Sequence, residues 1–269
     1  MTSAAEPAGT SGGRVLVTGA TGGIGQAIVR ALAARGARLA VSGRDASKLD
    51  ALVRGVSSEH APIALAADLG VTADRDRLVG DAARALGGLD ALVYAAGVVR
   101  YQELDAITEA DLEHQLRVNF VSALWLSKHA ADAMQASGTA GAIVHVASTL
   151  ALRPAKSTLA YAASKAALVS ATRSLALELG PRGIRVSCVA PGVIDTDMVR
   201  MPRLAPGEPE PHGEARTRRI EAQLRELEAL HPLGRLGTPD DVADAAVYLL
   251  DAPFVTGELL LVDGGLLLA

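Results

Sequence analysis

Tyr161 and Lys165 are four residues apart in the run Tyr-Ala-Ala-Ser-Lys. In a helix this spacing puts both side chains on one face. A free tyrosine has a pKa of about 10 and exchanges protons poorly near neutral pH, but a nearby cation favours the phenolate and lowers that pKa. The pair therefore predicts a tyrosine acid/base tuned by an ammonium group. The alternative is an ordinary pair on a helix surface, which a bare Tyr-x-x-x-Lys would favour.

The residues around this pair have the composition of a helix. Residues 161–178 are rich in Ala, Leu and Lys, with apolar residues at helical spacing. Gly180 and Pro181 are expected to end it.

A glycine-rich turn lies near the start of the chain. An apolar run at 14–18 leads into Gly19-Ala-Thr-Gly-Gly-Ile-Gly25 and then into a helical stretch. Strand, glycine-rich turn and helix in this order are typical of a phosphate-binding loop. Glycines let backbone amides approach a pyrophosphate, and the following helix N-terminus adds partial positive charge.

Short apolar strands alternate with helices along most of the chain. This rhythm predicts an α/β fold: a single-domain, Rossmann-type, doubly wound parallel sheet of about seven strands with helices on both faces. Since the strands do not alternate in polarity, we expect both of their faces to be buried. Expected strands are 14–18, 38–41, 63–66, 89–93, 142–146, 184–189 and 258–262. Expected helices are 46–54, 73–86, 108–136 (one helix or two), 161–178, 214–230 and 239–250, the last capped by Thr238.

The stretch 198–231 interrupts this rhythm. Residues 198–212 contain four prolines and are expected to be irregular, and a charged helix with leucines on one side follows. The excursion is either a solvated surface helix or a lid over a substrate pocket, and the sequence leaves both open.

Composition excludes several classes of function. The chain has 269 residues, 49% of them hydrophobic, and a net charge of −4, which gives no attraction to nucleic acid or to an anionic membrane. No apolar run approaches the roughly 18 residues of a membrane span. Residues 1–13 are small and polar and are interpreted as a disordered tail, with 14–269 as the folded domain.

Cysteine and histidine usage predicts neither a disulfide nor a metal site. Cys188 is the only cysteine, which fits a reducing compartment and a cytoplasmic protein. The histidines show no ligand spacing, so no metal is expected. They are His60, His114, His129, His145, His212 and His231.

The assembled motifs resemble the short-chain dehydrogenase/reductase family, in its 3-oxoacyl-reductase-like branch, from residue 14 to residue 265. Each piece is weak alone, whereas the order together with the gap from Ser148 to Tyr161 is specific. The pieces are Thr18-Gly19-Ala-Thr-Gly-Gly23-Ile-Gly25, Asp68, Ala96-Gly97, Asn119, Ser148, Tyr161 with Lys165, Pro191-Gly192-Val-Ile-Asp-Thr196 and Asp263-Gly-Gly265.

The resemblance implies hydride transfer between a nicotinamide and a secondary alcohol or ketone, including 3-oxoacyl groups. Tyr161 would exchange the proton with the substrate oxygen, and Lys165 would lower its pKa and hold the nicotinamide ribose. Ser148 would polarise the same oxygen. Asn119 would hold a water near Lys165 as a proton relay.

The resemblance also implies the residues that bind the cofactor. The glycine loop would approach the pyrophosphate, Asp68 the adenine, and Ile194 with Thr196 the carboxamide. The full implied set is Gly19, Thr21, Gly23, Ile24, Gly25, Arg44, Asp68, Leu69, Ala96, Gly97, Asn119, Tyr161, Lys165, Pro191, Gly192, Ile194 and Thr196.

Cofactor choice depends on the end of the second strand, where an acid binds the ribose 2′-hydroxyl and an arginine accommodates a 2′-phosphate. The residues here are Ser42-Gly43-Arg44-Asp45. Gly43 stands where a member that prefers NAD would carry its acid, so we expect NADP, with NAD as the alternative. Asp45 could cap a helix or oppose a phosphate.

One motif departs from the family pattern. Where the family usually reads Asn-Asn-Ala-Gly, this chain has Tyr94-Ala95-Ala96-Gly97. The missing amides are expected to weaken hydrogen bonding at the centre of the sheet and to shift contacts to the cofactor ribose.

Two other functions stay open on the same fold. A dehydratase or epimerase would be expected to add an acid or base near Ser148, where only Arg153 and Lys156 stand. A non-catalytic dinucleotide-binding protein would not need the Asn, Ser, Tyr and Lys set.

The expected substrate is a small carbonyl or alcohol compound. Its pocket is expected between 98–102, 150–158 and 198–230. By resemblance we expect a homo-oligomer, either a tetramer or a dimer, with the apolar run 266–268 buried or at a subunit contact.

Overall fold

A computed structural model describes residues 12–202 and 208–269. Within these residues seven parallel strands form one sheet in the order β3-β2-β1-β4-β5-β6-β7. The order changes direction between β1 and β4, as in a doubly wound Rossmann-type sheet, so the predicted fold class is confirmed. The strands are β1 (Arg14–Thr18), β2 (Arg38–Gly43), β3 (Ile63–Ala66), β4 (Ala91–Tyr94), β5 (Ala142–Val146), β6 (Arg185–Pro191) and β7 (Leu259–Val262).

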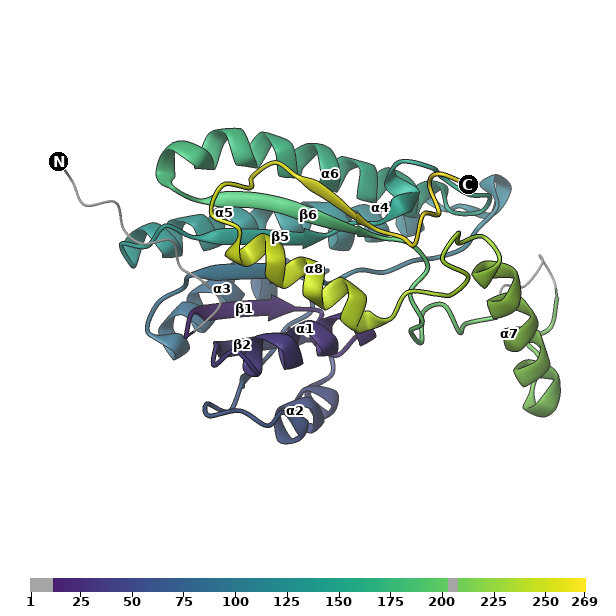
Figure 1. Ribbon diagram of the computed structural model, residues 1–269, viewed down its shortest axis with the longest axis horizontal. Helices are drawn as coiled ribbons and strands as arrows, with labels where there is room; N and C mark the ends of the chain where they lie inside the picture. Colours follow the sequence, from purple (N-terminus) through teal and green to yellow (C-terminus); the bar gives the residue numbers. More distant parts are fainter. Residues whose placement is uncertain (1–11, 203–207) are drawn as a thin grey trace.

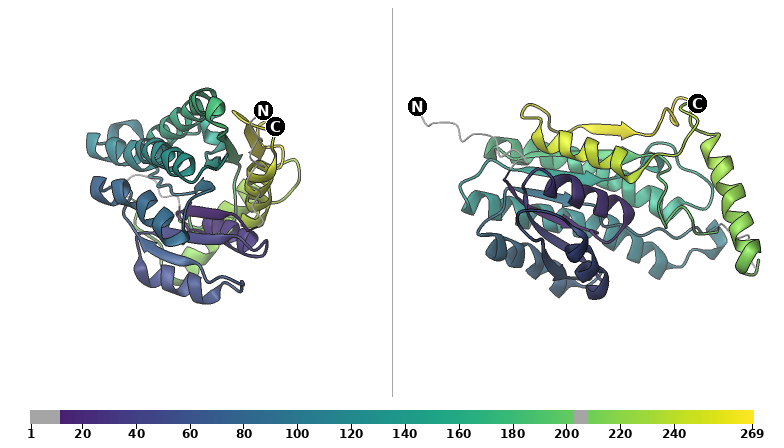
Figure 2. Two further views of the ribbon diagram at one scale, coloured as in Figure 1. Left: turned by 90° about the vertical axis from the view of Figure 1, so that its left-hand side faces the viewer. Right: turned by 60° about the horizontal axis from the view of Figure 1, so that its bottom comes forward.

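Helices cover the two faces of this sheet. Helices α1 and α8 lie side by side on one face, whereas α3, α5 and α6 pack on the other (Figures 1 and 2). The helices are α1 (Gly23–Ala33), α2 (Ala46–Gly55), α3 (Thr72–Leu86), α4 (Glu109–Leu116), α5 (Ser122–Ala136), α6 (Leu159–Leu179), α7 (Gly213–Glu228) and α8 (Pro239–Asp251). Short turns are the 3₁₀ turns η1 (Leu104–Ala106), η3 (Thr149–Ala151) and η4 (Gly180–Arg182) and the π-helical turn η2 (Arg117–Val121).

The core follows the period-two geometry of a strand. Val15 and Val17 of β1 belong to the apolar cluster under α1 and α8, and Leu16 between them belongs to the cluster under α3 and α5. Each of the three is at most 1% exposed. Both faces of the central strands are therefore buried, which is why their sequences are apolar throughout.

The expectation that every strand is buried on both faces is wrong at the edges of the sheet. In β3 the side chains of Ala64 and Ala66 are exposed, and in β7 Leu261 is 42% exposed. An edge strand has a neighbouring strand on one side only, so the covering layers end near it. An apolar sequence alone did not distinguish these edge strands from central ones.

The segment 108–136 is helical from Glu109 onward and divides into α4 and α5 around η2, so the two-helix form of the expectation is the correct one. The expected cap of α8 is confirmed. The Thr238 hydroxyl accepts a hydrogen bond from the Asp241 amide at 3.2 Å, and the Asp241 carboxylate accepts one from the Thr238 amide at 2.7 Å. This capping box fixes where the chain turns back toward β7.

Two predicted segments are only partly covered by the described residues. The predicted tail 1–13 lies outside them except for Gly12 and Gly13. Within 198–231, residues 203–207 lie outside; 198–202 and 208–212 contain neither helix nor strand, as expected, and α7 follows. Figure 1 shows α7 standing apart from the sheet at the end toward which the strands point. In the described part of the chain, no helix has the length and apolarity to cross a bilayer.

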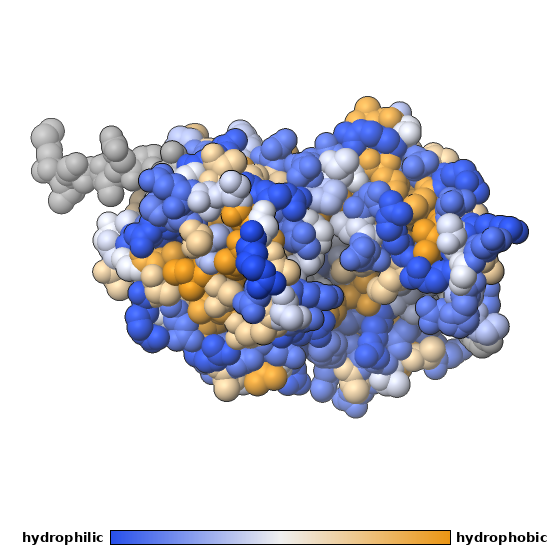
Figure 3. Space-filling view, turned by 90° about the horizontal axis from the view of Figure 1, so that it is seen from below, coloured by the Kyte–Doolittle hydropathy of each residue, from blue (hydrophilic) through white to orange (hydrophobic). Residues whose placement is uncertain are grey.

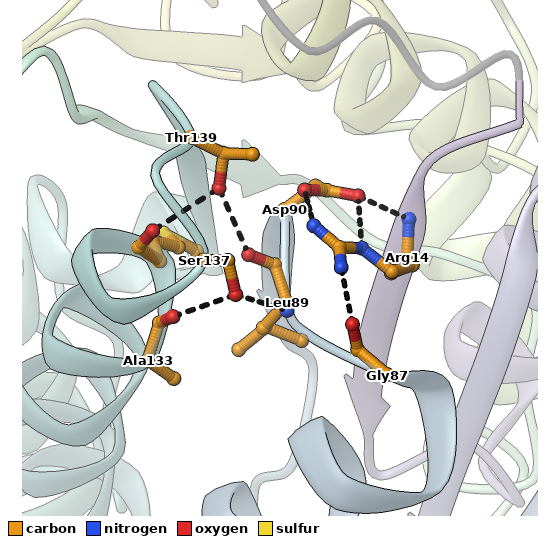
Figure 4. A network of polar contacts seen from close by, with 8 residues as sticks. Arg14, Gly87, Leu89, Asp90, Ala133, Ser137 and Thr139 are labelled. Carbon is orange, nitrogen blue, oxygen red and sulfur yellow. Dashed lines mark hydrogen bonds and ion pairs between the residues drawn. The ribbon is translucent and has the colours of Figure 1, made fainter.

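A polar network fastens the opposite, amino end of the sheet (Figure 4). The Arg14 guanidinium donates to both carboxylate oxygens of Asp90, at 2.8 and 2.7 Å, and to the carbonyl of Gly87 at 2.5 Å. The Ser137 hydroxyl accepts from the amide of Leu89 at 3.3 Å. Burial raises the pKa of Asp90, but the hydrogen bonds from Arg14 outweigh it, and the net pKa is below its ordinary value.

Replacement of Asp90 by Asn is expected to lower the free energy of unfolding by about 2 kcal/mol near neutral pH, because the partly buried Arg14 loses charge-assisted hydrogen bonds. The folded-state pKa of Asp90 is depressed, so its contribution is complete above its unfolded pKa of about 4 and is lost as the pH falls through the folded value. Urea unfolding of Asp90→Asn and wild type at pH 7 and pH 3 measures both effects. Glu214→Gln, in the exposed pair with Arg218, is the control and should change stability by less than about 0.5 kcal/mol. Equal losses in both variants would contradict the assignment.

Candidate active site

The predicted functional residues meet at the carboxyl ends of the strands. The glycine-rich loop follows β1, Ala96 and Gly97 follow β4, Ser148 follows β5, and the Gly192–Thr196 stretch follows β6. Helix α6 contributes Tyr161 and Lys165, and η2 contributes Asn119. Ligands of open α/β sheets bind at this edge, near the point where the strand order changes direction.

Lys165 has its amine inside the protein. The residue is 3% exposed, and its Nζ donates to the carbonyl of Val146, at the end of β5, at 2.7 Å. Burial lowers the pKa of Lys165 to about 8. Nζ lies 5.8 Å from the centroid of the Tyr161 ring, so the two side chains share one site, as the four-residue spacing predicts.

The predicted lowering of the Tyr161 pKa is wrong for the chain itself. Burial raises the pKa of Tyr161 to about 12, and the hydrogen bond with Ser148 only partly opposes this. The sequence shows the cation but not the desolvation of the phenolate, which is the main cause of the raised pKa. Tyr161 is therefore protonated at neutral pH.

Ser148 begins the 3₁₀ turn η3 and is 7% exposed. Its hydroxyl oxygen accepts a hydrogen bond from the amide of Leu150 at 3.1 Å. The hydroxyl proton can then be donated to an oxygen in front of it. Ser148 and Tyr161 line the same cavity, so both can reach one substrate atom.

Asn119 is fully buried in η2, and its side-chain amide is occupied by protein partners. Oδ1 accepts from the amide of Val98 at 2.8 Å, while Nδ2 donates to the carbonyl of Val98 and to the hydroxyl of Ser164, both at 2.9 Å. The side chain thus fixes the loop after β4 against the helix that carries Lys165. A water held here would use the main chain or the second lone pair of Oδ1.

The π-helical turn was not expected from the sequence. The amide of Ser122 bonds to the carbonyl of Arg117, five residues earlier, which marks one extra residue in the helix. Such turns are rare and recur at functional sites. Asn119 and Ser122 are buried polar residues in a largely apolar helical run, and they were the only sign of it.

The glycine loop fits a bound pyrophosphate. Gly19 has φ +63°, and a Cβ on it would lie 2.6 Å from Cα of Ala96. A Cβ on Gly25 would lie 2.1 Å from the Gly19 carbonyl oxygen. Among the described residues, the N-terminus of α1 has no side-chain cap and no acid in its first turn, so its amides can bind an anion. Ile24 packs beside this loop against the core.

The stretch after β6 reaches the same loop. A Cβ on Gly23 would lie 2.8 Å from Cγ2 of Thr196. Pro191 is buried at the end of β6, and the amide of Gly192 donates to the carbonyl of Val262 at 2.9 Å. Ile194 is 4% exposed and forms an isolated bridge with Gly237. The predicted carboxamide residues are therefore held beside the predicted pyrophosphate residues.

Asp68 and Leu69 lie beyond β3, in the outer part of the site. The Asp68 carboxylate accepts from the amide of Gly70 at 2.8 Å, and the Leu69 carbonyl accepts from the hydroxyl of Ser122 at 2.6 Å. Asp68 is half-buried.

The end of β2 contains the residues expected to select the cofactor. A Cβ on Gly43 would lie 3.1 Å from the hydroxyl oxygen of Thr21, so the first loop and the end of β2 are adjacent. Arg44 is exposed and forms no ion pair within residues 12–202 and 208–269. Asp45 caps α2: its carboxylate accepts from the amide of Lys48 at 3.1 Å and the hydroxyl of Ser47 at 2.6 Å. Its interpretation as a helix cap is confirmed.

A cavity of about 1030 Å³ opens beside Tyr161 and Ser148. The three predicted pocket segments, 98–102, 150–158 and 198–230, all contribute to its wall. Figure 3 shows the molecule hollowed between the body of the sheet and the end that carries α7, with apolar residues inside the hollow. Apolar lining residues include Val99, Leu150, Val193, Met198, Met201, Leu227, Leu230, Leu266 and Leu267.

Sequence reasoning placed Arg153 in this wall but missed Glu103, Leu266, Leu267 and Ala269. Arg153 donates to the carbonyls of Leu266 and Ala269, at 3.1 and 2.7 Å, and so holds the stretch 266–269 against the cavity. Glu103 also lines the cavity, although no motif pointed to it. Gln223 of α7 donates to the carbonyls of Val199 and Met201, at 2.7 and 3.1 Å. No local pattern in the sequence predicted these long-range contacts.

Comparison with known proteins gives the family. The family model described as enoyl-(acyl carrier protein) reductase matches residues 19–267. The chain is 36% identical to the 3-oxoacyl-[acyl-carrier-protein] reductase of Bos taurus over 93% of this chain and 96% of that protein. It is 38% identical to the L-rhamnose 1-dehydrogenase (NAD(P)(+)) of Azotobacter vinelandii, over 94% and 95%. A solved structure named as a short-chain alcohol dehydrogenase from Sinorhizobium meliloti 1021 superposes with a TM-score of 0.85 at 31% identity, covering 96% and 98%.

The chain belongs to the short-chain dehydrogenase/reductase family. The resemblance drawn from its motifs is confirmed, including the 3-oxoacyl-reductase-like branch. The activity of this family is that of an NAD(P)-dependent oxidoreductase acting on an alcohol or ketone, and the chain is such an enzyme. Among the described residues, no three His, Cys, Asp or Glu side chains come together as a metal site would require.

The buried amine of Lys165 should make the chain less stable at neutral pH than an isosteric apolar residue would. The folded pKa of about 8 lies below the ordinary value of about 10.5, so between these values the unfolded chain binds more protons and wild-type stability rises with pH. At pH 7 the free energy of unfolding of Lys165→Met should exceed that of wild type by about 1–2 kcal/mol, a figure that already allows for the lost hydrogen bond to Val146. This difference in stability should disappear by about pH 10.

Urea unfolding of both proteins at pH 7, 8.5 and 10 measures this difference. Lys48→Met, at an exposed position of α2, is the control and should show no such pH dependence. A Lys165→Met protein less stable than wild type at pH 7 would show that the amine is stabilised in the fold.

Proposed function

We propose that the chain is an NADPH-dependent ketone reductase in which Tyr161 is the proton donor. The observation that carries this proposal is that Tyr161 and Ser148 line one large cavity, while the buried amine of Lys165 lies 5.8 Å from the centroid of the tyrosine ring. A glycine loop suited to a pyrophosphate lies at the same edge of the sheet. Gly19, Gly23, Gly25 and the N-terminus of α1 would hold the pyrophosphate, and Ile194 with Thr196 the nicotinamide carboxamide. The bound nicotinamide supplies the hydride.

The protein's part of the chemistry is to position and protonate the substrate oxygen. Ser148 donates a hydrogen bond to that oxygen and polarises the carbonyl. Tyr161, protonated at neutral pH because burial raises its pKa to about 12, gives its proton to the same oxygen as charge develops there. The ammonium of Lys165, close to the tyrosine ring, stabilises the phenolate that remains.

Preference for NADPH is supported by the end of β2. Gly43 offers no carboxylate to a ribose 2′-hydroxyl, and the exposed Arg44 is available for a 2′-phosphate. Asp45 is engaged in capping α2, which leaves less of its charge directed at a phosphate. NAD stays an alternative, because the Thr21 hydroxyl beside Gly43 could form a hydrogen bond with a ribose hydroxyl. It is the weaker one, because no carboxylate is offered at Gly43.

The substrate is proposed to be a ketone with a sizeable apolar part. Leu, Met and Val side chains form a large apolar part of the lining, against which an acyl chain would be buried, and polar side chains such as Gln102, Glu103 and Lys156 line the rest. A 3-oxoacyl chain, as named for the bovine relative, fits this lining better than a sugar such as rhamnose, named for the bacterial relative. A dehydratase or epimerase that used Arg153 as its added base is less favoured, because this side chain is occupied by main-chain carbonyls.

We also propose the domain organisation, the oligomeric state and the location of the protein. Residues 14–269 would act as one dehydrogenase domain in which the 198–231 excursion covers the substrate. A homo-oligomer, tetramer or dimer, is supported by the exposed apolar residues Leu261 of β7 and Phe254 between α8 and β7. A cytoplasmic location is supported by the free, buried thiol of Cys188.

Replacement of Tyr161 by Phe should lower kcat for ketone reduction by at least about a hundredfold, because the proton donor is removed while the ring is kept. The dissociation constant for NADPH should stay within about threefold. Initial rates of NADPH oxidation with a panel of apolar 2- and 3-oxo compounds, together with NADPH fluorescence titration, measure both quantities. Tyr248→Phe, on the exposed side of α8, is the matched control. Comparable turnover in Tyr161→Phe and wild type would remove this tyrosine from the mechanism.

Replacement of Arg44 by Ala should weaken NADPH binding by roughly tenfold or more and NADH binding by less than about twofold. The reason is that only NADPH has a 2′-phosphate, whose contact with the Arg44 guanidinium would be lost. Paired fluorescence titrations with NADPH and NADH measure the ratio. Arg54→Ala, an exposed arginine at the other end of α2, controls for a general loss of positive charge. Equal weakening of both cofactors would refute the NADPH preference.

A further inference from the structure

Tyr94 is the residue that departs from the family pattern and that the proposed mechanism does not use. It ends β4 and is completely buried. Its ring meets the ring of His145 on β5 edge-on, with centroids 6.4 Å apart and planes at 81°. Its hydroxyl donates to the carbonyl of Val118 at 2.5 Å. The expected loss of hydrogen bonding at the sheet centre is therefore offset by a bond from the tyrosine itself.

The acceptor of this bond is part of the π-helical turn η2. Val118 directly precedes Asn119, whose side-chain amide makes two hydrogen bonds to the main chain of Val98. Consecutive residues of η2 therefore hold the two ends of the segment 94–98. Tyr94 holds the end nearer the sheet, and Asn119 holds the end nearer the substrate cavity.

The middle of this segment touches both halves of the active site. The backbone of Ala96 lies against Gly19 so closely that a Cβ there would be 2.6 Å away. A Cβ on Gly97 would lie 3.4 Å from Nζ of Lys165 and 3.5 Å from Oδ1 of Asn119. A displacement of 95–97 would thus alter the phosphate loop on one side and the catalytic amine on the other.

The other end of η2 is fastened independently. The hydroxyl of Ser122 bonds to the carbonyls of Arg117 and Leu69, at 2.8 and 2.6 Å. This contact ties the turn to the loop after β3. Without the Tyr94 hydroxyl, η2 would keep this attachment and the bonds of Asn119 to Val98, but it would lose its hydrogen bond to the end of β4. The Ser122 hydroxyl would also lose its contact with Tyr94.

We propose that Tyr94 is a positioning residue: its hydroxyl fixes η2 to the end of β4 and so sets the distance between Asn119, the segment 95–97 and Lys165. Tyr94 itself does not reach the reacting atoms. It stands where the family usually has an amide. Its longer side chain reaches the π-helical turn and holds this turn to the end of β4 by the bond to Val118. The part of this inference that concerns turnover rests on the proposed function.

Tyr94→Phe tests the proposal, because it keeps the ring and its contact with His145 and removes only the hydroxyl. We expect kcat for ketone reduction to fall roughly tenfold, with KM for the ketone and the dissociation constant for NADPH changed less than threefold. Hydrogen exchange of the peptide covering 95–100 should be faster, since the amide of Val98 loses protection when η2 shifts. Tyr248→Phe, exposed on α8, should change none of these.

The outcomes separate the inference from the proposed function. Unchanged kcat and unchanged exchange of 95–100, with or without a lower melting temperature, would overturn the positioning role and leave Tyr94 as a packing residue. If the wild-type protein reduces no ketone in the panel, the proposed function fails, and exchange of 95–100 still decides whether Tyr94 fixes this segment. Should Tyr94→Phe not fold, Ser164→Ala removes the parallel contact of Asn119 and should raise exchange in the same peptide.

Discussion

The amine of Lys165 lies inside the protein, and the arrangement of the neighbouring active-site residues depends on this burial. A buried ammonium needs acceptors, and the carbonyl of Val146 at the end of β5 is one. To reach it, Lys165 passes beside Gly97, where even a methyl group would approach Nζ to 3.4 Å. The position of α6 relative to β4 and β5 is therefore constrained by one polar group as well as by apolar packing. The same burial puts the pKa of Lys165 near 8, where its charge can respond to the tyrosine beside it.

The two ends of the sheet divide stability and function between them. At the amino end, Arg14 and Asp90 form charge-assisted bonds that cross from β1 to the start of β4. At the carboxyl end, buried polar groups such as Lys165 and Asn119 are surrounded by main-chain partners, and a π-helical turn replaces regular helix. Such features cost stability, and they are retained where the geometry serves a reaction. The Arg14–Asp90 network (Figure 4) and the active site thus lie at opposite ends of the same central strands.

The sequence predicted what is encoded locally. The glycines from Gly19 to Gly25, the spacing of Tyr161 and Lys165, and the cap at Thr238 each follow from short-range rules, and each lies where it was expected. The π-helical turn could not be predicted, because one extra helical residue leaves the apolar pattern almost unchanged. The raised pKa of Tyr161 depends on how far the fold desolvates its phenol, and the contact of Arg153 with 266–269 joins residues more than one hundred positions apart. Both are products of tertiary packing and leave no trace in a single motif.

The excursion that carries α7 has a solvated side, as expected of a surface helix, and a side at the cavity, which supports the proposal that it is a lid. One side of the helix is solvated, with the exposed pair Arg218 and Glu214. The other side faces the cavity, where Leu227 and Leu230 form part of the wall. Gln223 lies between these sides, only 8% exposed, and its bonds to the carbonyls of Val199 and Met201 tie α7 to the chain that follows Thr196. A movement of α7 would therefore move Met201 at the substrate wall and strain the residues that would hold the nicotinamide carboxamide. An amphipathic helix held by these hydrogen bonds can be a surface helix and the proposed lid at once, because its charged side is exposed to solvent and its apolar side lies at the cavity.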